Sequence, residues 1–242
     1  MEPVHPEVVS AGERRRRSTN SALLLGAALA AAVLSIGALV GCGGDDDKTS
    51  PASLRDQLLP ASEVPGFKSE GKVDYDNPHD FVADRIPVPE TTPPSQPVDA
   101  FENAGFEAGV GEGFVKGKPS EGPGGVAVAV AQHGSDDDAR EALDYVRKEG
   151  LKQPCSAACA MEGKEVAVTG IPGAKGWQQT PVPDPPPNVP PDLLTSYSVG
   201  FTIGSRLYLV DVHGAPGQVK KDQVLDAAEA LFKHNAEPDA GS

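Results

Sequence analysis

The chain has 242 residues, 35 of them acidic and 21 basic, which gives a net charge of −14 and an isoelectric point near 4.7. Such an acidic surface repels phosphate backbones and anionic lipid heads, which argues against nucleic-acid binding. The length suits an export segment followed by one domain large enough for a hydrophobic core.

An export signal is the first predicted element. Arg14 to Arg17 precede Ser21 to Gly41, an uncharged run of small apolar residues that ends at Cys42. A basic segment, an apolar segment and small residues at the exit are typical of a secretory signal. The run is also close to the ~20 residues that cross a bilayer as a helix, so an uncleaved helical anchor is the alternative.

The end of this run favours lipidation. Leu39-Val40-Gly41-Cys42 resembles the bacterial lipobox, whose cysteine is diacylated on sulfur before the chain is cleaved in front of it. Two acyl chains hold a protein stably on a membrane. We therefore predict a signal peptide at 1–41, a lipidated tether at 42–51 and a single folded domain at 52–242. Its location would be the outer face of the cytoplasmic membrane, exposed to the cell envelope.

Cleavage leaves the charge almost unchanged. Residues 1–41 hold four of the 21 basic and three of the 35 acidic residues, so the mature chain has 17 basic and 32 acidic residues and a net charge of about −15. After the tether, Ser53 to Leu59 predict a short helix that Pro60 ends. From Pro65 to Pro97, Gly, Asp and Pro predict irregular structure with one edge strand.

Two similar segments follow. Gly125 to His133 alternate valine and alanine and predict a strand, after which Ser135 caps a helix that ends at Gly150. Arg206 to His213 predict a second strand. The helix after it has a predicted buried face of Val224, Leu225, Ala228, Leu231 and Phe232.

Each of these strands follows a predicted hairpin partner. Gly113 to Lys116 is the partner in the first copy, and Tyr197 to Ile203 in the second, where Gly204-Ser205 forms the turn. Two copies of hairpin-plus-helix predict an α+β fold, with an antiparallel sheet and helices packed on one face.

Several phrases of the sequence resemble a known group of proteins. They are LLPASEVPGF at 58–67, AFENAGFEAGVGEGFVKG at 100–117 and IPGAKGW at 171–177, together with the closing strand and helix. They are similar to actinobacterial exported lipoproteins and, more distantly, to the extracellular sensor domains of actinobacterial serine/threonine kinases. The resemblance implies an extracellular, non-catalytic role and no catalytic residues. Those sensor domains use two disulfides around a cleft, whereas this chain can form one.

The cysteines suit an exported protein. With Cys42 lipidated, Cys155 and Cys159 remain as one pair, which an oxidising compartment would convert to a disulfide. A bridge across so short a loop would restrain the loop and stabilise the fold little. The alternative is a soft-metal site for copper(I), in which Met161 would be a further ligand.

Three other side chains are candidates for binding. His133 and His213 end the two matching strands, which could bring two imidazoles together as a metal or pH-sensing pair; the alternative is that each merely precedes a turn glycine. Trp177 stands before the proline run at 180–192 and could line an apolar groove, although a lone tryptophan more often belongs to the core.

Motifs for catalysis are missing from the sequence. Residues 109–120 resemble a phosphate loop, but Pro119 replaces the Ser/Thr that would reach magnesium. Residues 122–127 fit G-x-G-x-x-A but lead into a strand rather than a helix. There is no G-x-S-x-G and no H-E-x-x-H. We therefore predict a protein without cofactor or enzymatic activity that binds a small ligand or senses the envelope; the alternatives are a scaffolding lipoprotein with a protein partner and a copper-handling protein.

Overall fold

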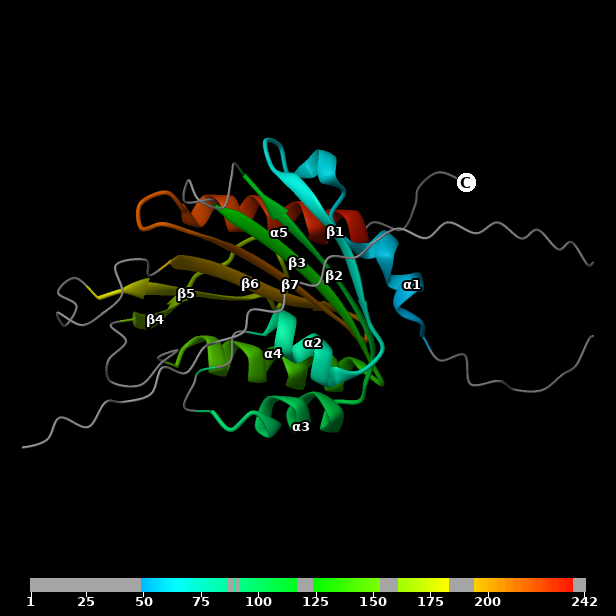
Figure 1. Ribbon diagram of the computed structural model, residues 1–242. Helices are drawn as coiled ribbons and strands as arrows, with labels where there is room; N and C mark the ends of the chain where they lie inside the picture. The colour runs from blue at the N-terminus through cyan, green and yellow to red at the C-terminus, as the bar shows by residue number, and fades with distance from the viewer. Residues whose placement is uncertain are drawn as a thin grey trace, which may run out of the picture. The chain divides into compact units, whose positions relative to one another are not determined.

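The computed structural model describes residues 49–86, 89, 92–116, 124–152, 161–182 and 194–236. Seven strands lie in this part of the chain: β1 Lys68–Tyr75, β2 Phe106–Val115, β3 Gly125–His133, β4 Met161–Val166, β5 Lys175–Pro181, β6 Thr195–Ile203 and β7 Arg206–Gly214. They form one sheet in the order β1-β2-β3-β7-β6-β5-β4, and every neighbouring pair is antiparallel (Figure 1).

Five helices accompany the sheet: α1 Pro51–Leu54, α2 Pro78–Arg85, α3 Ser95–Asn103, α4 Asp136–Gly150 and α5 Lys221–Ala236. Short 3-10 turns at Arg55–Gln57 and Ala61–Glu63 follow α1. The α+β class with an antiparallel sheet, predicted from the sequence, is confirmed.

Helix starts follow the capping residues. Ser135 precedes α4, and its Oγ accepts a hydrogen bond from the backbone N–H of Asp138 at 3.2 Å. Asn77 precedes α2 and accepts from the N–H of Asp80 at 2.9 Å, with Pro78 at the first helical position. Both caps satisfy backbone donors that have no partner within a helix.

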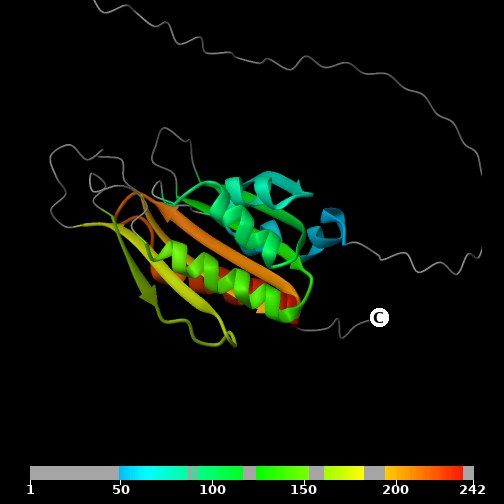
Figure 2. The ribbon, with the colours of Figure 1, turned by 90° about the horizontal axis from the view of Figure 1, so that it is seen from below.

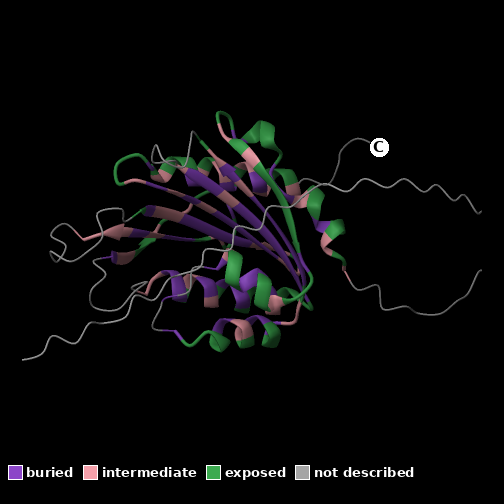
Figure 3. Ribbon diagram, viewed as in Figure 1, coloured by how far each residue is buried: buried purple, intermediate pink, exposed green. Residues whose placement is uncertain are grey.

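The helices cover both faces of the sheet. In Figure 1 α5 lies above the strands, and α2, α3 and α4 lie below them; in Figure 2 α4 is in front of β7 and α5 is behind it. One core packs Val128 and Val130 of β3 with residues of α5 such as Leu231. The other packs Ala129 and Ala131 of the same strand with residues of α2, α3 and α4. Figure 3 shows the central strands as buried.

The prediction of helices on one face was therefore wrong. It rested on the alternation of valine and alanine along β3, because alternation is typical of a strand with one wet face. Here Ala129 and Ala131 are buried as well, under α4 and its neighbours. Leu207 and Leu209 of β7 belong to the same core as Ala129 and Ala131.

The two hairpin-plus-helix units repeat in element order alone. β2, β3 and α4 match β6, β7 and α5 in sequence, and β3 pairs antiparallel with β7 at the centre of the sheet. A two-fold axis that exchanges antiparallel neighbours is perpendicular to the sheet, so it would place both helices on the same face. Since α4 and α5 lie on opposite faces, no rotation of this kind relates the two units.

The segment at 65–97 has more regular structure than predicted. The edge strand is present as β1, but α2 and the start of α3 also fall in this segment. The predicted partner strand at 113–116 is the end of a longer strand, β2, and the predicted partner at 197–203 lies within β6. β4 and β5 had no sequence prediction.

Candidate functional site

Small residues hollow the sheet on the face that carries α2 and α4. The backbone register aligns one row of residues across five strands, from β2 to β5: Gly113, Ala127, Asp211, Ser198 and Trp177. A parallel row beside it contains Gly111, Ala129, Leu209 and Gly200. The side chains of Arg85 and Glu70 lie over Gly111 and Gly113, which have no Cβ to exclude them. Ala127 and Ala129 carry only a methyl group each and leave open space on this face.

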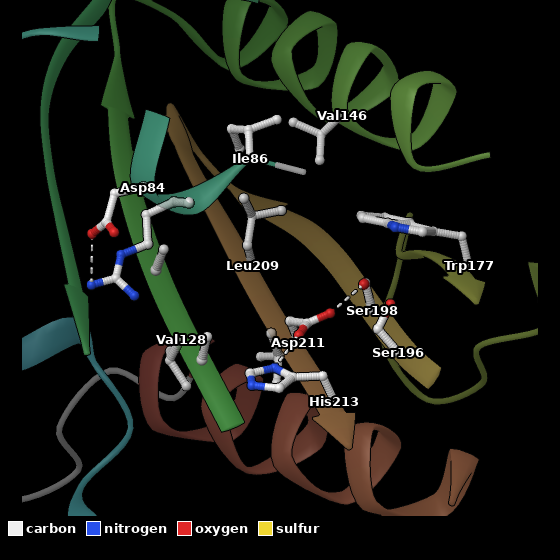
Figure 4. Close-up of a pocket in the computed structure, with 14 residues that line it drawn as sticks. Asp84, Ile86, Val128, Val146, Trp177, Ser196, Ser198, Leu209, Asp211 and His213 are labelled. Carbon is white, nitrogen blue, oxygen red and sulfur yellow. Dashed lines mark hydrogen bonds and ion pairs between the residues drawn. The ribbon is translucent and has the colours of Figure 1, made fainter. Parts of the chain in front are cut away.

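This space forms a groove of about 350 Å³, shown in Figure 4. Its apolar walls come from Ile86 at the end of α2, Val146 of α4, Trp177 of β5 and Leu209 of β7. These four side chains are nearly buried, so the groove belongs to the interior packing of the domain. The volume lies at the lower end of the range of small-molecule sites.

One end of the groove is polar. Asp211 of β7 accepts two hydrogen bonds, from Ser198 Oγ at 2.8 Å and from His213 Nδ1 at 2.9 Å. Ser198 faces Asp211 directly across the β6–β7 ladder. His213 faces Gly125 across the β3–β7 ladder, and a Cβ at Gly125 would stand 2.5 Å from His213 Nε2. The glycine therefore makes room for the imidazole.

Charge interactions raise the pKa of His213. The largest contribution is the hydrogen bond to Asp211, whose carboxylate favours the protonated imidazole; Asp211 and Glu70 also attract that proton through their negative charge. Burial of the ring acts in the opposite direction. The carboxylates of Asp211 and Glu70 are therefore the charges that act on this histidine.

The opposite wall contains an arginine whose charge is already paired. Arg85 Nε donates to Tyr75 Oη at 2.6 Å, and the guanidinium contacts Asp84 at 3.3 Å. It also lies 5.6 Å from the centre of the Tyr75 ring, and 12% of its side chain is exposed. The Tyr75 hydroxyl donates to Asp84, and its pKa rises to about 12, first because of burial and then because of this bond.

The arrangement suits binding better than acid–base catalysis. A Ser-His-Asp triad places the imidazole between the hydroxyl and the carboxylate, so that it can remove the hydroxyl proton. Here the carboxylate of Asp211 lies between Ser198 and His213. Within the described ranges, no group of three or more His, Cys, Asp or Glu residues is arranged to hold a metal ion.

The structure does not bring His133 and His213 together as a pair. Neighbouring antiparallel strands run in opposite directions, so the last residues of β3 and β7 lie at opposite ends of the sheet. His213 faces Gly125, eight residues before His133 on β3, which is roughly 27 Å at the usual rise per residue. His133 is buried instead, and its Nδ1–H donates to the carbonyl of Ala104 at 2.6 Å.

Trp177 has both of the roles considered for it. It is 2% exposed and belongs to the core under α4, and it also lines the groove. Residues 183–192 of the proline run lie outside the described residues.

Sequence reasoning missed Asp211, Ser198 and Arg85. The signal for Asp211 was a charged residue inside the apolar strand RLYLVDVH, which marks a place where the covered face opens. Ser198 carried no comparable signal, because serine is common in strands with wet faces. Arg85 was missed together with α2.

The cysteine predictions stay untested. Cys42, Cys155 and Cys159 lie outside the described residues, as do the signal peptide and most of the tether. None of the helices among the described residues is long and apolar enough to span a membrane.

Comparison with known proteins gives a likeness of fold. No protein-family model matches the chain, and no curated protein matches it. Among solved structures, the chain resembles the extracellular domain of PknH from Mycobacterium tuberculosis, with 13% sequence identity and a TM-score of 0.50. The match covers 80% of this chain and all of the other. At this identity the likeness shows that the two chains share a fold.

Proposed function

We propose that this protein is a non-catalytic, lipid-anchored cell-surface protein whose folded domain binds a small ligand in the groove. The observation that carries the proposal is the groove itself: about 350 Å³, with apolar walls and hydrogen-bonding groups gathered at one end. Sites for small molecules have this composition, since apolar walls provide affinity and a few polar groups fix the orientation.

The location is proposed from the sequence. An acylated Cys42 would hold the domain on the outer face of the cytoplasmic membrane, where an oxidised Cys155–Cys159 pair would be stable. Support for an envelope role comes from the neighbouring structure, which is itself an extracellular domain. Ligand binding there would let the protein sense or carry a component of the envelope.

The test is native mass spectrometry of the mature lipoprotein extracted from its own envelope. We expect an adduct of small mass on the wild-type protein. Ala127→Phe places a ring in the centre of the groove floor and should remove the adduct. Ala61→Phe makes the same change at an exposed position of the 3-10 turn and should keep it.

An adduct that survives Ala127→Phe would place binding elsewhere. A wild-type protein without any adduct, found instead with a second polypeptide, would support the alternative of a scaffolding lipoprotein.

A further inference from the structure

We infer that the groove selects a small amphiphile with a cationic amine head, and that protonation of His213 releases it. This inference rests on the proposed function, because it names the ligand class of the same groove. It is based on two neighbouring features of the groove. The carboxylate of Asp211 can accept more hydrogen bonds than it receives, and the apolar walls beside it leave space for a short hydrocarbon chain.

The carboxylate of Asp211 can accept further hydrogen bonds. Its two oxygens offer about four acceptor positions, and one hydrogen bond reaches each oxygen, from Ser198 and from His213. About a third of the side chain is exposed, at the polar end of the groove. An ammonium group is the donor best matched to such a site, because a charge-assisted hydrogen bond is about twice as strong as a neutral one.

The remaining charges of the groove favour a cation over an anion. The guanidinium of Arg85 is held by Asp84 and Tyr75, so its charge is balanced locally. Glu70 adds a second negative charge on the same face, since a Cβ at Gly113 in the row of Asp211 would lie 2.9 Å from its Oε2. When His213 is neutral, the carboxylate of Asp211 has no cationic partner among the groups that line the groove.

The hydrocarbon body has a matching surface. Leu209 and Ile86 lie on the far side of the groove from His213, and Trp177 closes the end of the row that contains Asp211 (Figure 4). An amphiphile with its head at Asp211 would direct its chain between α2 and α4, where Val146 also faces the space. Burial of each further methylene there should tighten binding of the tail.

His213 competes for the same carboxylate. When the imidazole is protonated it neutralises Asp211 from 2.9 Å, and a second cation gains less there. The groups facing His213 from the neighbouring strands are Ser196 of β6 and Gly125 of β3, both uncharged, and Glu70 acts on it from β1. Amine binding and proton binding at His213 therefore oppose one another, and by linkage each lowers the affinity for the other.

Three probes with the same tail test the head group: hexylamine, hexanol and hexanoate. Their binding is measured by titration calorimetry on the mature lipoprotein in phosphatidylcholine nanodiscs, with empty nanodiscs as the blank. At pH 8.5 we expect the amine to bind about tenfold more tightly than the alcohol, and hexanoate most weakly. Asp211→Asn should remove the preference. Asp226→Asn makes the same charge change on α5, across the sheet, and should preserve it.

The proton linkage gives a second readout. A primary amine stays protonated from pH 6 to 8.5, as a lysine does. We expect hexylamine affinity in the wild-type protein to fall as the pH decreases over this range, and proton release to appear as a dependence of the binding heat on the buffer. His213→Gln should show neither effect, because an amide can still donate to Asp211 but does not titrate.

The outcomes distinguish the preference for an amine head group from ligand binding in the groove. Equal affinities for the three probes, or a preference for hexanoate, would overturn the head-group inference while leaving a ligand-binding groove. Failure of all three probes to bind would overturn the inference and count against the groove as well. If Asp211→Asn does not fold, the pH series on the wild-type protein and His213→Gln decides, since a flat wild-type series also overturns the inference.

Discussion

At the scale of single residues, the two strand-end histidines bind protons with opposite consequences for stability. Burial lowers the pKa of His133, with the carbonyl of Ala104 opposing this in part, whereas the hydrogen bond to Asp211 raises the pKa of His213. His133 therefore favours the folded state only while it is neutral, so its contribution is lost as the pH falls below about 6.5. The contribution of His213 is complete below about 6.5 and is lost as the pH rises through its raised pKa.

His133→Gln should flatten the acid side of the stability profile. The buried Nε2 of His133 has no hydrogen-bond partner among the described residues, so a proton there would be buried without an acceptor, and the negative charges of Asp138 and Glu107 offset the cost of burial only in part. In the wild-type protein each pH unit below about 6.5 should cost up to about 1.4 kcal/mol from this residue. Denaturant unfolding from pH 7 to pH 5 measures it. His79→Gln, at a side chain that is 76% exposed, is the control and should keep the wild-type slope. Parallel profiles for the wild-type protein and His133→Gln would refute the argument.

Gly111→Ala tests whether the absence of a Cβ at position 111 is needed for the position of Arg85 in the groove wall. A Cβ at this position would collide with Nε of Arg85, which lies flat on β2 and contacts Tyr75. Gly111→Ala should displace the guanidinium and cost about 1–3 kcal/mol, as other overpacking changes do. Gly124→Ala is the matched control, because its Cβ would meet only the carbonyl of His213, at 3.6 Å. Thermal melts of the two variants should differ clearly; similar melting temperatures would mean that Arg85 moves without cost.

At the scale of elements, α5 shows which part of an amphipathic helix the sequence determines. Its predicted apolar stripe is real: Val224, Ala228 and Leu231 are buried against the sheet. Phe232 was predicted to lie on the buried face; it is partly buried, at the margin of the stripe, where its ring packs edge-on against Phe201 at 5.7 Å. Helical periodicity gives the direction of the stripe, but its width depends on how the helix sits on the strands.

Three substitutions in α5 compare the stability contributed by the centre of the apolar stripe, by its margin and by the exposed side of the helix. Leu231→Ala should cost about 2–5 kcal/mol, because the side chain is fully buried. Phe232→Ala should cost less than the about 3–5 kcal/mol expected for a buried phenylalanine. Glu229→Gln, on the exposed side and paired with Lys233 at 2.6 Å, should change stability by less than about 0.5 kcal/mol. Chemical denaturation ranks them; equal losses for Leu231→Ala and Glu229→Gln would remove the amphipathic argument.

The elements that were predicted well from the sequence are those with strong local signals, such as alternating side chains or capping residues. β3 alternates over nine residues and α4 has a serine cap and a closing glycine, so both were predicted with the observed bounds. α2 has eight residues, starts with proline and contains few apolar side chains, and its pattern looks like a loop. Phe81 and Arg85 of α2 pack over Gly109 and Gly111 of β2. The position of α2 therefore depends on contacts between residues that are distant in the sequence. The groove depends on register across five strands, which no local pattern contains.

At the scale of the whole molecule, the sheet separates two cores that differ in their packing. The core under α5 contains large side chains from every central strand, among them Phe201 and Tyr208 stacked at 5.1 Å. The core under α4 is interrupted where Ala127 and Ala129 of β3 line the groove. If the proposed ligand binds in the groove, it lies on the face that carries α4 and leaves the core under α5 intact. Ala127 is partly exposed and belongs to neither core, so we expect Ala127→Phe to cost less stability than a substitution of a buried residue that faces α5.

The proposed lipid anchor would fix the location of the domain, and Cys42→Ala tests it. The quartet before Cys42 predicts acylation of its sulfur, without which the signal peptidase for lipoproteins has no substrate. We expect the variant to accumulate as an uncleaved precursor or to be shed, and mass spectrometry should find no acylated N-terminus. Cys155→Ala removes a cysteine outside the quartet and should leave acylation intact. If Cys42→Ala keeps the wild-type mature mass and still partitions into detergent, the apolar run at 21–41 is itself the anchor. A transmembrane helix would then attach the domain to the membrane. The charge of about −15 would not attach it, because an acidic surface is not attracted to anionic lipid.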